Sequence, residues 1–309
     1  MTSARVADRK AINRRPVVHL VSFQLVHPST PEEAVDLLAR APAGETAVLA
    51  GGTDLLSDLD QVRINPQQVV SLRKLPWRYL RWEGASLVVG STLPLRTLEL
   101  DARVKKQLPG LWEAIRDVGS LALRSRATLG GNVARCSPAS DLIPVLLALD
   151  ARVRIVGPSG VREHPVDMVL QESRKTSLGP AELIESVILP AAAPSTYLWQ
   201  RVQPVNDISQ VGVAAAFLPE GPHWRIALGG LQPRARRLSE AEAVLRSARP
   251  THFEMELAAQ EASRRAEFVS DKRATESYRR RLVMVMVRRA IQTTLERMPK
   301  EPSSRKASR

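Results

Sequence analysis

The chain has almost no cysteine, few aromatic residues and no long apolar run. Cys136 is the single cysteine among 309 residues, so no disulfide can form within the chain. An iron–sulfur cluster generally needs about four thiolates, so any cluster used with this protein must lie on another chain. Aromatic residues make up 4%, which predicts a core built mainly of leucine, valine, alanine and isoleucine.

The same scarcities bear on location and on metals. No apolar stretch approaches the roughly 18 residues that a transmembrane helix needs, so no transmembrane segment is expected. Arg14-Arg15 before an apolar stretch resembles an export signal, but polar residues interrupt that stretch and no clear cleavage site follows. A lone thiol favours a reducing compartment, and we expect a cytoplasmic protein. The scattered histidines lack metal-ligand spacing, so no metal site is expected.

Basic residues are in excess, with 45 Lys and Arg against 32 Asp and Glu, a net charge of +13. Many lie late in the chain, including the Arg279-Arg280-Arg281 run and Arg288-Arg289. Such a surplus is compatible with nucleic acid or with an acidic protein partner. Because no aromatic platform or nucleic-acid motif accompanies it, we favour a solvated or partner-facing surface, and no nucleic acid as a partner.

Composition changes divide the chain into four parts. Residues 1–18 are basic and unpatterned, and we expect a disordered extension. A first domain should cover 19–193 and end in the alanine-rich linker before Pro194. A second domain should cover 194–298, and 299–309 should form a disordered tail.

Alternating strand and helix patterns run through both domains. Ser29 to Glu33 predicts the start of a helix, with Thr30 as the cap and Pro31 in the first turn. A strand over Val48 to Ala50 should then deliver the chain to a glycine-rich loop. In the second domain we expect paired strands over 211–218 and 224–228, then helices over 239–248, 253–268 and 275–298.

Two glycine loops, about eighty residues apart, are the most informative feature. They read Ala50-Gly51-Gly52-Thr53-Asp54-Leu55 and Thr128-Leu129-Gly130-Gly131-Asn132. Glycine pairs let backbone amides approach a bulky anion such as a pyrophosphate. The first loop lacks the G-x-G-x-x-G spacing of a Rossmann fold. It could also be a plain turn in which a glycine supplies positive φ and Thr53 or Asp54 caps a helix.

Small polar residues follow the second loop and enrich its chemistry. Asn132 offers an amide, Ser137 a hydroxyl, and Asp141 a carboxylate suited to a ribose or ribityl hydroxyl. Asp141 could instead cap the helix that begins near Pro144. Two such loops predict a dinucleotide held between two backbone clamps.

The second loop and its continuation to Pro144 resemble the FAD-binding medium subunit of molybdenum hydroxylases, the family of xanthine dehydrogenase and aerobic carbon monoxide dehydrogenase. Ala50 to Leu56 resembles its first FAD loop, and the stretch from Arg174 to Ile184 its strand beside the flavin. Ala227 to Gly230 and Tyr278-Arg279 resemble motifs of its C-terminal domain. The likeness runs from about Phe23 to Met298.

The resemblance implies an α+β fold: a vanillyl-alcohol-oxidase (PCMH)-type FAD-binding domain of two subdomains, followed by a C-terminal α+β domain of the carbon monoxide dehydrogenase flavoprotein type. FAD would bind without a covalent bond, and no residue would be an acid–base catalyst. By position, the residues implied to hold FAD are Leu49, Ala50, Gly51, Gly52, Thr53, Asp54, Leu55, Thr128, Gly130, Gly131, Asn132, Ser137, Asp141 and Ile184.

The family resemblance also implies partners. Electrons would leave a substrate at a molybdopterin centre on a large subunit and cross iron–sulfur clusters on a small subunit. They would then pass through this FAD to NAD, oxygen or a quinone. The chain departs from the family after the linker, where Trp199 and Gln203 stand at positions that are commonly basic, although Arg201 lies between them. A cation near the flavin would raise its potential, so this departure bears on the terminal acceptor.

Two other functions remain open at this stage. A free-standing FAD-dependent oxidoreductase of the same fold would need acid and base residues over the flavin, and no convincing set is visible. A basic nucleic-acid or scaffold protein without flavin would be colourless, and its binding would weaken steeply with salt.

Overall fold

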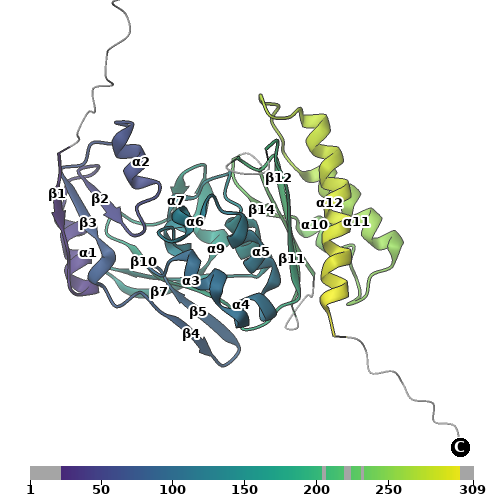
Figure 1. Ribbon diagram of the computed structural model, residues 1–309, viewed down its shortest axis with the longest axis horizontal. Helices are drawn as coiled ribbons and strands as arrows, with labels where there is room; N and C mark the ends of the chain where they lie inside the picture. The colour runs from purple at the N-terminus through teal and green to yellow at the C-terminus, as the bar shows by residue number, and fades with distance from the viewer. Residues whose placement is uncertain (1–21, 204–206, 219–223, 231–232, 300–309) are drawn as a thin grey trace, which may run out of the picture.

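The structure is a computed structural model that describes residues 22–203, 207–218, 224–230 and 233–299. Within these ranges the chain forms three α+β units that follow one another along its length (Figure 1). This confirms the expected α+β class. None of the helices in the described ranges combines the length and the apolar character needed to cross a membrane.

The N-terminal unit is a small parallel sheet with two helices. Its strand order is β1-β3-β2, so β3 lies between the first two strands. The elements are β1 (Gln24–Val26), α1 (Pro31–Arg40), β2 (Thr46–Leu49), α2 (Leu55–Asp60), β3 (Gln68–Ser71) and the short 3₁₀ turn η1 (Leu72–Lys74).

Helix α1 begins where the sequence predicts. The Thr30 hydroxyl accepts a hydrogen bond from the Glu33 amide, and Pro31 occupies the first turn. The helix packs through Ala34, Val35 and Leu38 on the sheet. The sequence predicts the chemistry of this cap because all its parts lie within four residues.

The central unit is a five-stranded antiparallel sheet, in the order β4-β5-β10-β6-β7, with helices on one side (Figure 1). Its strands are β4 (Leu80–Glu83), β5 (Ser86–Gly90), β6 (Arg152–Gly157), β7 (Gly160–Pro165) and β10 (Leu183–Pro190), beside the small pair β8 (Leu170–Glu172) and β9 (Lys175–Thr176). Its helices are α3 (Leu95–Leu100), α4 (Ala102–Gln107), α5 (Pro109–Asp117), α6 (Leu121–Arg124), α7 (Leu129–Arg135), α8 (Leu142–Ala148) and α9 (Val166–Val169).

The C-terminal unit is a four-stranded antiparallel sheet covered by helices. Its order is β11-β12-β13-β14. The elements are β11 (Ser195–Gln200), β12 (Val211–Phe217), β13 (Trp224–Gly229), β14 (Arg236–Arg237), α10 (Ser239–Glu242), α11 (His252–Arg265) and α12 (Glu276–Arg297). The predicted pairing of β12 with β13 is confirmed.

The C-terminal sheet is buried on both faces, and β12 shows how. Ala214 and Ala216 belong to the same buried cluster as the central helices, including Leu111 and Leu146. Val213 and Ala215, which alternate with them along the strand, belong instead to the cluster under α11 and α12. Successive strand residues point to opposite faces, so one face of β12 packs on the helices of the central unit and the other packs under α11 and α12. The central and C-terminal units are therefore in direct apolar contact through β12.

Two expectations for the C-terminal unit are wrong in detail. The helix expected over 239–248 ends at Glu242, and beyond its end the Ser247 carbonyl accepts from the Trp224 indole on β13 at 3.0 Å, which fixes this stretch as a non-helical loop. The Arg279-Arg280-Arg281 run is not wholly on the surface. Arg279 is buried and donates to the Gln210 carbonyl at 2.7 Å.

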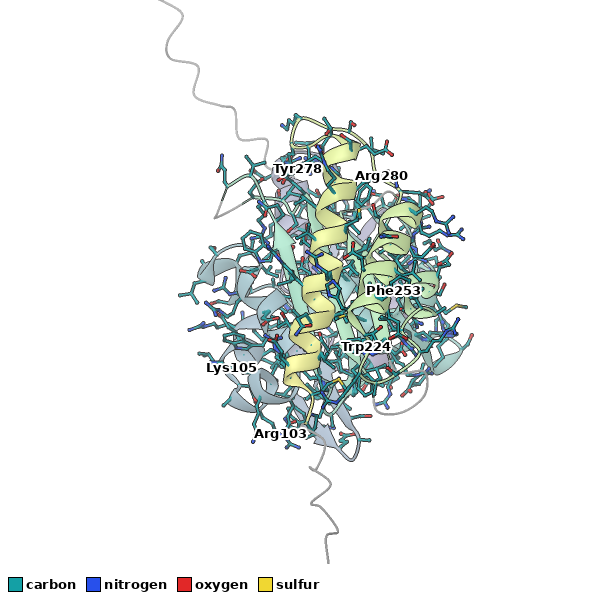
Figure 2. All side chains as sticks on the ribbon, turned by 90° about the vertical axis from the view of Figure 1, so that its right-hand side faces the viewer. Arg103, Lys105, Trp224, Phe253, Tyr278 and Arg280 are labelled. Carbon is teal, nitrogen blue, oxygen red and sulfur yellow. The ribbon has the colours of Figure 1, made fainter. Side chains whose placement is uncertain are left out.

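Helix α12 carries Arg280, Arg281, Arg288 and Arg289, and Figure 2 shows the face formed by α11 and α12, with Arg280 labelled near one end. Several are offset by acids on the same face: Arg280 pairs with Glu276 at 2.8 Å and Arg288 with Glu256 at 3.0 Å. This surface therefore carries mixed charge, with the exposed ring of Phe253 among it.

Candidate functional site

The first glycine loop joins β2 to α2 and presents a row of unused amide groups. In the described part of the chain, the amides from Gly51 to Leu55 donate to no acceptor. Gly52 has a φ of +82°, a conformation that favours glycine. Asp54 stands at the start of α2 but its side chain makes no capping bond. Of the plain-turn alternative, the structure therefore shows the positive φ of Gly52 but no helix cap by the Asp54 side chain.

The second glycine loop forms the start of α7. Thr128 caps this helix, since its Oγ1 accepts from the Gly131 amide at 3.0 Å. The amide of Gly130 has no acceptor among the described residues, whereas that of Leu129 faces Leu93 in the antiparallel bridge between Pro94 and Thr128. The second loop therefore keeps one free donor, the Gly130 amide, because the amide of Gly131 is satisfied within the loop.

The two loops lie against each other, as the sequence predicts. An added Cβ on Gly51 would lie 2.0 Å from the Arg126 carbonyl oxygen, and one on Gly131 would lie 4.0 Å from the Ala50 Cβ. Arg126 also donates to the Gly51 carbonyl at 3.5 Å. Gly51 thus permits direct backbone contact between segments far apart in the sequence.

A third segment closes the site from the central sheet. A Cβ on Gly130 would lie 2.5 Å from the Ser91 Cβ, just after β5. Ile184 lies on β10, beside an irregularity in the register between Ile184 and Ser186. The two loops and the ends of strands β5 and β10 therefore meet around one space.

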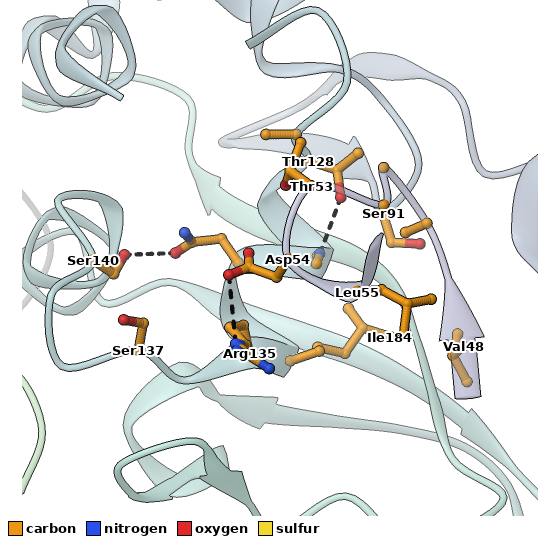
Figure 3. A pocket seen from close by; sticks show the side chains of 18 of the residues that line it. Val48, Thr53, Asp54, Leu55, Ser91, Thr128, Arg135, Ser137, Ser140 and Ile184 are labelled. Atoms are coloured by element: carbon orange, nitrogen blue, oxygen red, sulfur yellow. Dashed lines mark hydrogen bonds and ion pairs between the residues drawn. The ribbon is translucent and has the colours of Figure 1, made fainter. Parts of the chain in front are cut away.

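That space is a cleft of about 690 Å³, within the range of ligand sites, and Figure 3 shows part of its wall. Its walls come from both glycine loops, from the strand ends at Ser91 and Ile184, and from the loop before β12. Leu49 is not part of the lining. The other residues predicted to hold the cofactor all line the cleft: Ala50, Gly51, Gly52, Thr53, Asp54, Leu55, Thr128, Gly130, Gly131, Asn132, Ser137, Asp141 and Ile184.

The polar residues after the second loop are partly committed to each other. The Ser140 hydroxyl donates to the Asn132 side-chain oxygen at 2.7 Å (Figure 3). The same Ser140 oxygen accepts from the amides of Leu142 and Ile143. Ser140, and not Asp141, therefore caps α8 with its side chain, and the capping alternative for Asp141 is wrong.

Asp141 instead joins the central unit to the C-terminal unit. One carboxylate oxygen accepts from the Tyr197 and Ser209 hydroxyls, both at 2.6 Å. The other accepts from Arg201, also at 2.6 Å. Burial, reinforced by the Asp141 charge, raises the pKa of Tyr197 well above its ordinary value. Sequence spacing cannot reveal this network, because its members lie on separate elements.

Arg201 is buried, and Asp141 balances its charge. Its guanidinium also lies 4.1 Å from the Trp199 ring centroid, and the Trp199 indole donates to Asp117. Burial raises the pKa of Asp117, while the Trp199 hydrogen bond opposes that rise. Arg201 is thus held in place by neighbours and is not a free cation.

The other residues considered from the sequence have structural roles. Arg124 pairs with both carboxylate oxygens of Glu99, at 2.8 and 3.1 Å. The Cys136 thiol is buried and donates to the Glu172 carbonyl at 3.2 Å. Burial raises the pKa of this thiol, which matches a core side chain better than a redox sensor. No three His, Cys, Asp or Glu residues gather into a metal site within the described ranges.

Comparisons with known proteins match both parts of the chain. Residues 21–192 match the model of the FAD binding domain in molybdopterin dehydrogenase, and residues 200–294 that of the CO dehydrogenase flavoprotein C-terminal domain. The carbon monoxide dehydrogenase medium chain of Hydrogenophaga pseudoflava is 28% identical over 275 residues, covering 87% of this chain and 96% of that one. The xanthine dehydrogenase FAD-binding subunit of Escherichia coli O157:H7 is 27% identical, with coverage of 85% and 92%.

A solved structure extends the likeness to three dimensions. It is a carbon monoxide dehydrogenase of Hydrogenophaga pseudoflava that lacks the Mo-pyranopterin moiety of its molybdenum cofactor. Its TM-score is 0.83 at 28% identity, over 90% of this chain and 98% of that one. Together with the domain match, this confirms the expected α+β fold of the PCMH type.

Proposed function

Because the chain belongs to the family of FAD-binding domains of molybdopterin dehydrogenases, we propose that it is the electron-transfer subunit of a larger molybdopterin-dependent hydroxylase or dehydrogenase. Substrate oxidation occurs at molybdopterin on a large subunit. Electrons then cross iron–sulfur clusters on a small subunit and leave through FAD, held here without a covalent bond. The acceptor is NAD, oxygen or a quinone.

The observation that carries this proposal is a row of free amides on one cleft. The amides from Gly51 to Leu55 line it, with that of Gly130 on the adjoining loop. Unpaired backbone donors in a concave surface favour a negatively charged group. The diphosphate of FAD supplies such a group, so the residues present fit this cofactor.

Some of the remaining lining residues can form hydrogen bonds with the cofactor, and others leave room for it. The Thr53 and Ser137 hydroxyls and the side-chain NH₂ group of Asn132 would bind sugar or ribityl hydroxyls. Asp141 also lines the cleft, although its carboxylate already accepts from Tyr197, Ser209 and Arg201. Gly131 contributes room in place of a donor, because its amide is taken by Thr128. Ile184 offers its backbone near the start of β10, the middle strand of the central sheet. Bound FAD supplies the redox chemistry, while these residues orient it and exclude water.

Partner subunits follow from what this chain can hold. Its lone Cys136 is buried, so the iron–sulfur clusters lie on another chain. The chain also covers 96% of a carbon monoxide dehydrogenase medium chain, a part of an assembly. The single thiol further supports a cytoplasmic location.

Arg201 bears on the choice of acceptor. A free cation beside the flavin stabilises its anionic reduced form. Here Asp141 neutralises Arg201 at 2.6 Å, so we propose a flavin potential that is not raised by this arginine.

Purification of a tagged chain from its native source tests the proposal. A flavin spectrum, release of all FAD by acid precipitation, and co-purifying chains that carry molybdenum and iron would support it. A yellow protein that turns over substrate with no partner would favour the free-standing oxidoreductase. A colourless protein that stays colourless after incubation with FAD would refute both.

A further inference from the structure

An ion-pair cluster lines one side of the cleft, between the helices that begin at the two glycine loops. Arg135, in the last turn of α7, donates to both carboxylate oxygens of Asp58 on α2, at 2.6 and 3.2 Å. Its Nε also lies 3.5 Å from an Asp54 carboxylate oxygen, the ion pair drawn in Figure 3. Arg63 reaches Asp58 at 3.1 Å. A two-point ion pair thus links α2 to α7.

Helix α2 has little else to hold it in place. Asp58 and Leu59 are its only buried residues, and Leu56 is 51% exposed. A helix of six residues is too short to be stable alone, so tertiary contacts must fix its position. Leu59 supplies apolar contact, and Asp58 supplies the directional contact to α7. Since α2 follows the first glycine loop directly, whatever fixes α2 also fixes that loop.

The charges in this cluster are balanced. Arg63 and Arg135 face Asp58 and Asp54, so Arg135 is not a surplus cation available to a diphosphate. The hydrogen bond from Arg135 is the main cause that holds the pKa of Asp58 below its ordinary value. Asp58 therefore stays ionised at neutral pH, and the link is intact under working conditions.

We propose that Arg135 is a positioning residue for FAD. By binding Asp58 it fixes α2, and with it the amides from Gly51 to Leu55, against the loop that begins α7. This proposal rests on the proposed FAD site and deepens it. Arg135 acts through α2 and does not itself contact the diphosphate.

The test measures the rate of FAD dissociation from the reconstituted full-length protein, by the recovery of flavin fluorescence. Arg135→Met and Asp58→Asn should each raise this rate about 10- to 100-fold. The double variant should be no faster than the faster single variant, because both changes break the same link. Arg135→Lys keeps the charge but not the two-point geometry, so its rate should fall between those of the wild type and Arg135→Met.

Arg63→Met is the matched control. It removes a cation from the same carboxylate, but its side chain is 48% exposed and the contact stays within one segment. The rate should change by about threefold or less. Unfolding of the apo-proteins by urea shows whether each variant is folded before FAD is added.

Asp58→Asn separates positioning from direct binding. If Arg135 contacts the diphosphate, Asp58→Asn frees its guanidinium, so FAD should bind as tightly as in the wild type or more tightly, which would overturn the proposal. Wild-type rates in all variants would also overturn it while leaving the FAD site intact. Failure of the wild-type protein to bind FAD would instead refute the proposed function.

Discussion

Gly51→Ala should separate the two glycine loops with the smallest possible change. The added Cβ would lie 2.0 Å from the Arg126 carbonyl oxygen, and the next atoms are also backbone, with the Arg126 carbonyl carbon at 2.8 Å. Real contacts of this kind lie above about 3 Å, so the loops must move apart by roughly 1 Å. Overpacking of this type costs about 1–3 kcal/mol of stability.

The effect on FAD should exceed the effect on folding. A displacement of about 1 Å in a positioned site can cost roughly 100-fold, which corresponds to about 2.7 kcal/mol of binding free energy. Titration of the apo-protein with FAD, followed by flavin fluorescence, measures the dissociation constant. Far-ultraviolet circular dichroism and urea unfolding measure the fold.

Gly179→Ala provides the matched control. Its added Cβ would meet only the flexible side chain of Glu182, at 3.4 Å or more. This variant should bind FAD like the wild type. If Gly51→Ala also binds FAD with wild-type affinity, the contact between the loops does not shape the cofactor site and the reasoning is refuted.

Four further changes probe the same architecture. Gly131→Trp should fill the cleft, because a side chain at this position would meet only Thr128 and Ala50 among the described residues. The purified protein should lack flavin absorbance yet retain its C-terminal fold. Full occupancy by FAD would count against binding between the two glycine loops. Tyr197→Phe removes one donor to Asp141 and should destabilise the protein by about 1 kcal/mol in urea unfolding; an unchanged midpoint would show that Arg201 and Ser209 satisfy Asp141 alone. In the folded protein the pKa of Asp58 lies below its ordinary value of 3.8. The contribution of Asp58 to stability is therefore complete above pH 3.8 and is lost as the pH falls through the lower, folded-state pKa. Asp58→Asn should make the loss of stability in acid less steep, and an acid profile identical to that of the wild type would contradict this. Residues 1–193 expressed alone should aggregate, because α5 and α8 lose the apolar contact with β12; a soluble fragment with native FAD affinity would show that the units are independent.

Local chemistry explains what the sequence predicts well. The Thr30 cap and the positive φ of Gly52 depend on neighbouring residues, and both occur in the structure. The convergence of the two glycine loops is also predicted, although by their shared chemistry and family resemblance. Backbone donors around an anion leave a recognisable pattern because glycine is required where the main chain must approach closely.

Side-chain pairs between distant elements leave no such pattern. Arg135 and Asp58 lie 77 positions apart, and nothing in either segment indicates the other. The same holds for Asp141 and Arg201, 60 positions apart. From the sequence, Asp141 is a possible helix cap, yet the neighbouring Ser140 is of a residue type that suits the position as well. Tertiary hydrogen bonds to Tyr197 and Ser209 decide the matter.

A crystal structure of the protein with bound FAD would show directly whether the glycine loops hold the diphosphate. The diphosphate should lie within hydrogen-bond distance of the amides between Gly51 and Leu55, with that of Gly130 on its other side. A diphosphate bound elsewhere, or held by side chains while these amides face only water, would contradict this prediction.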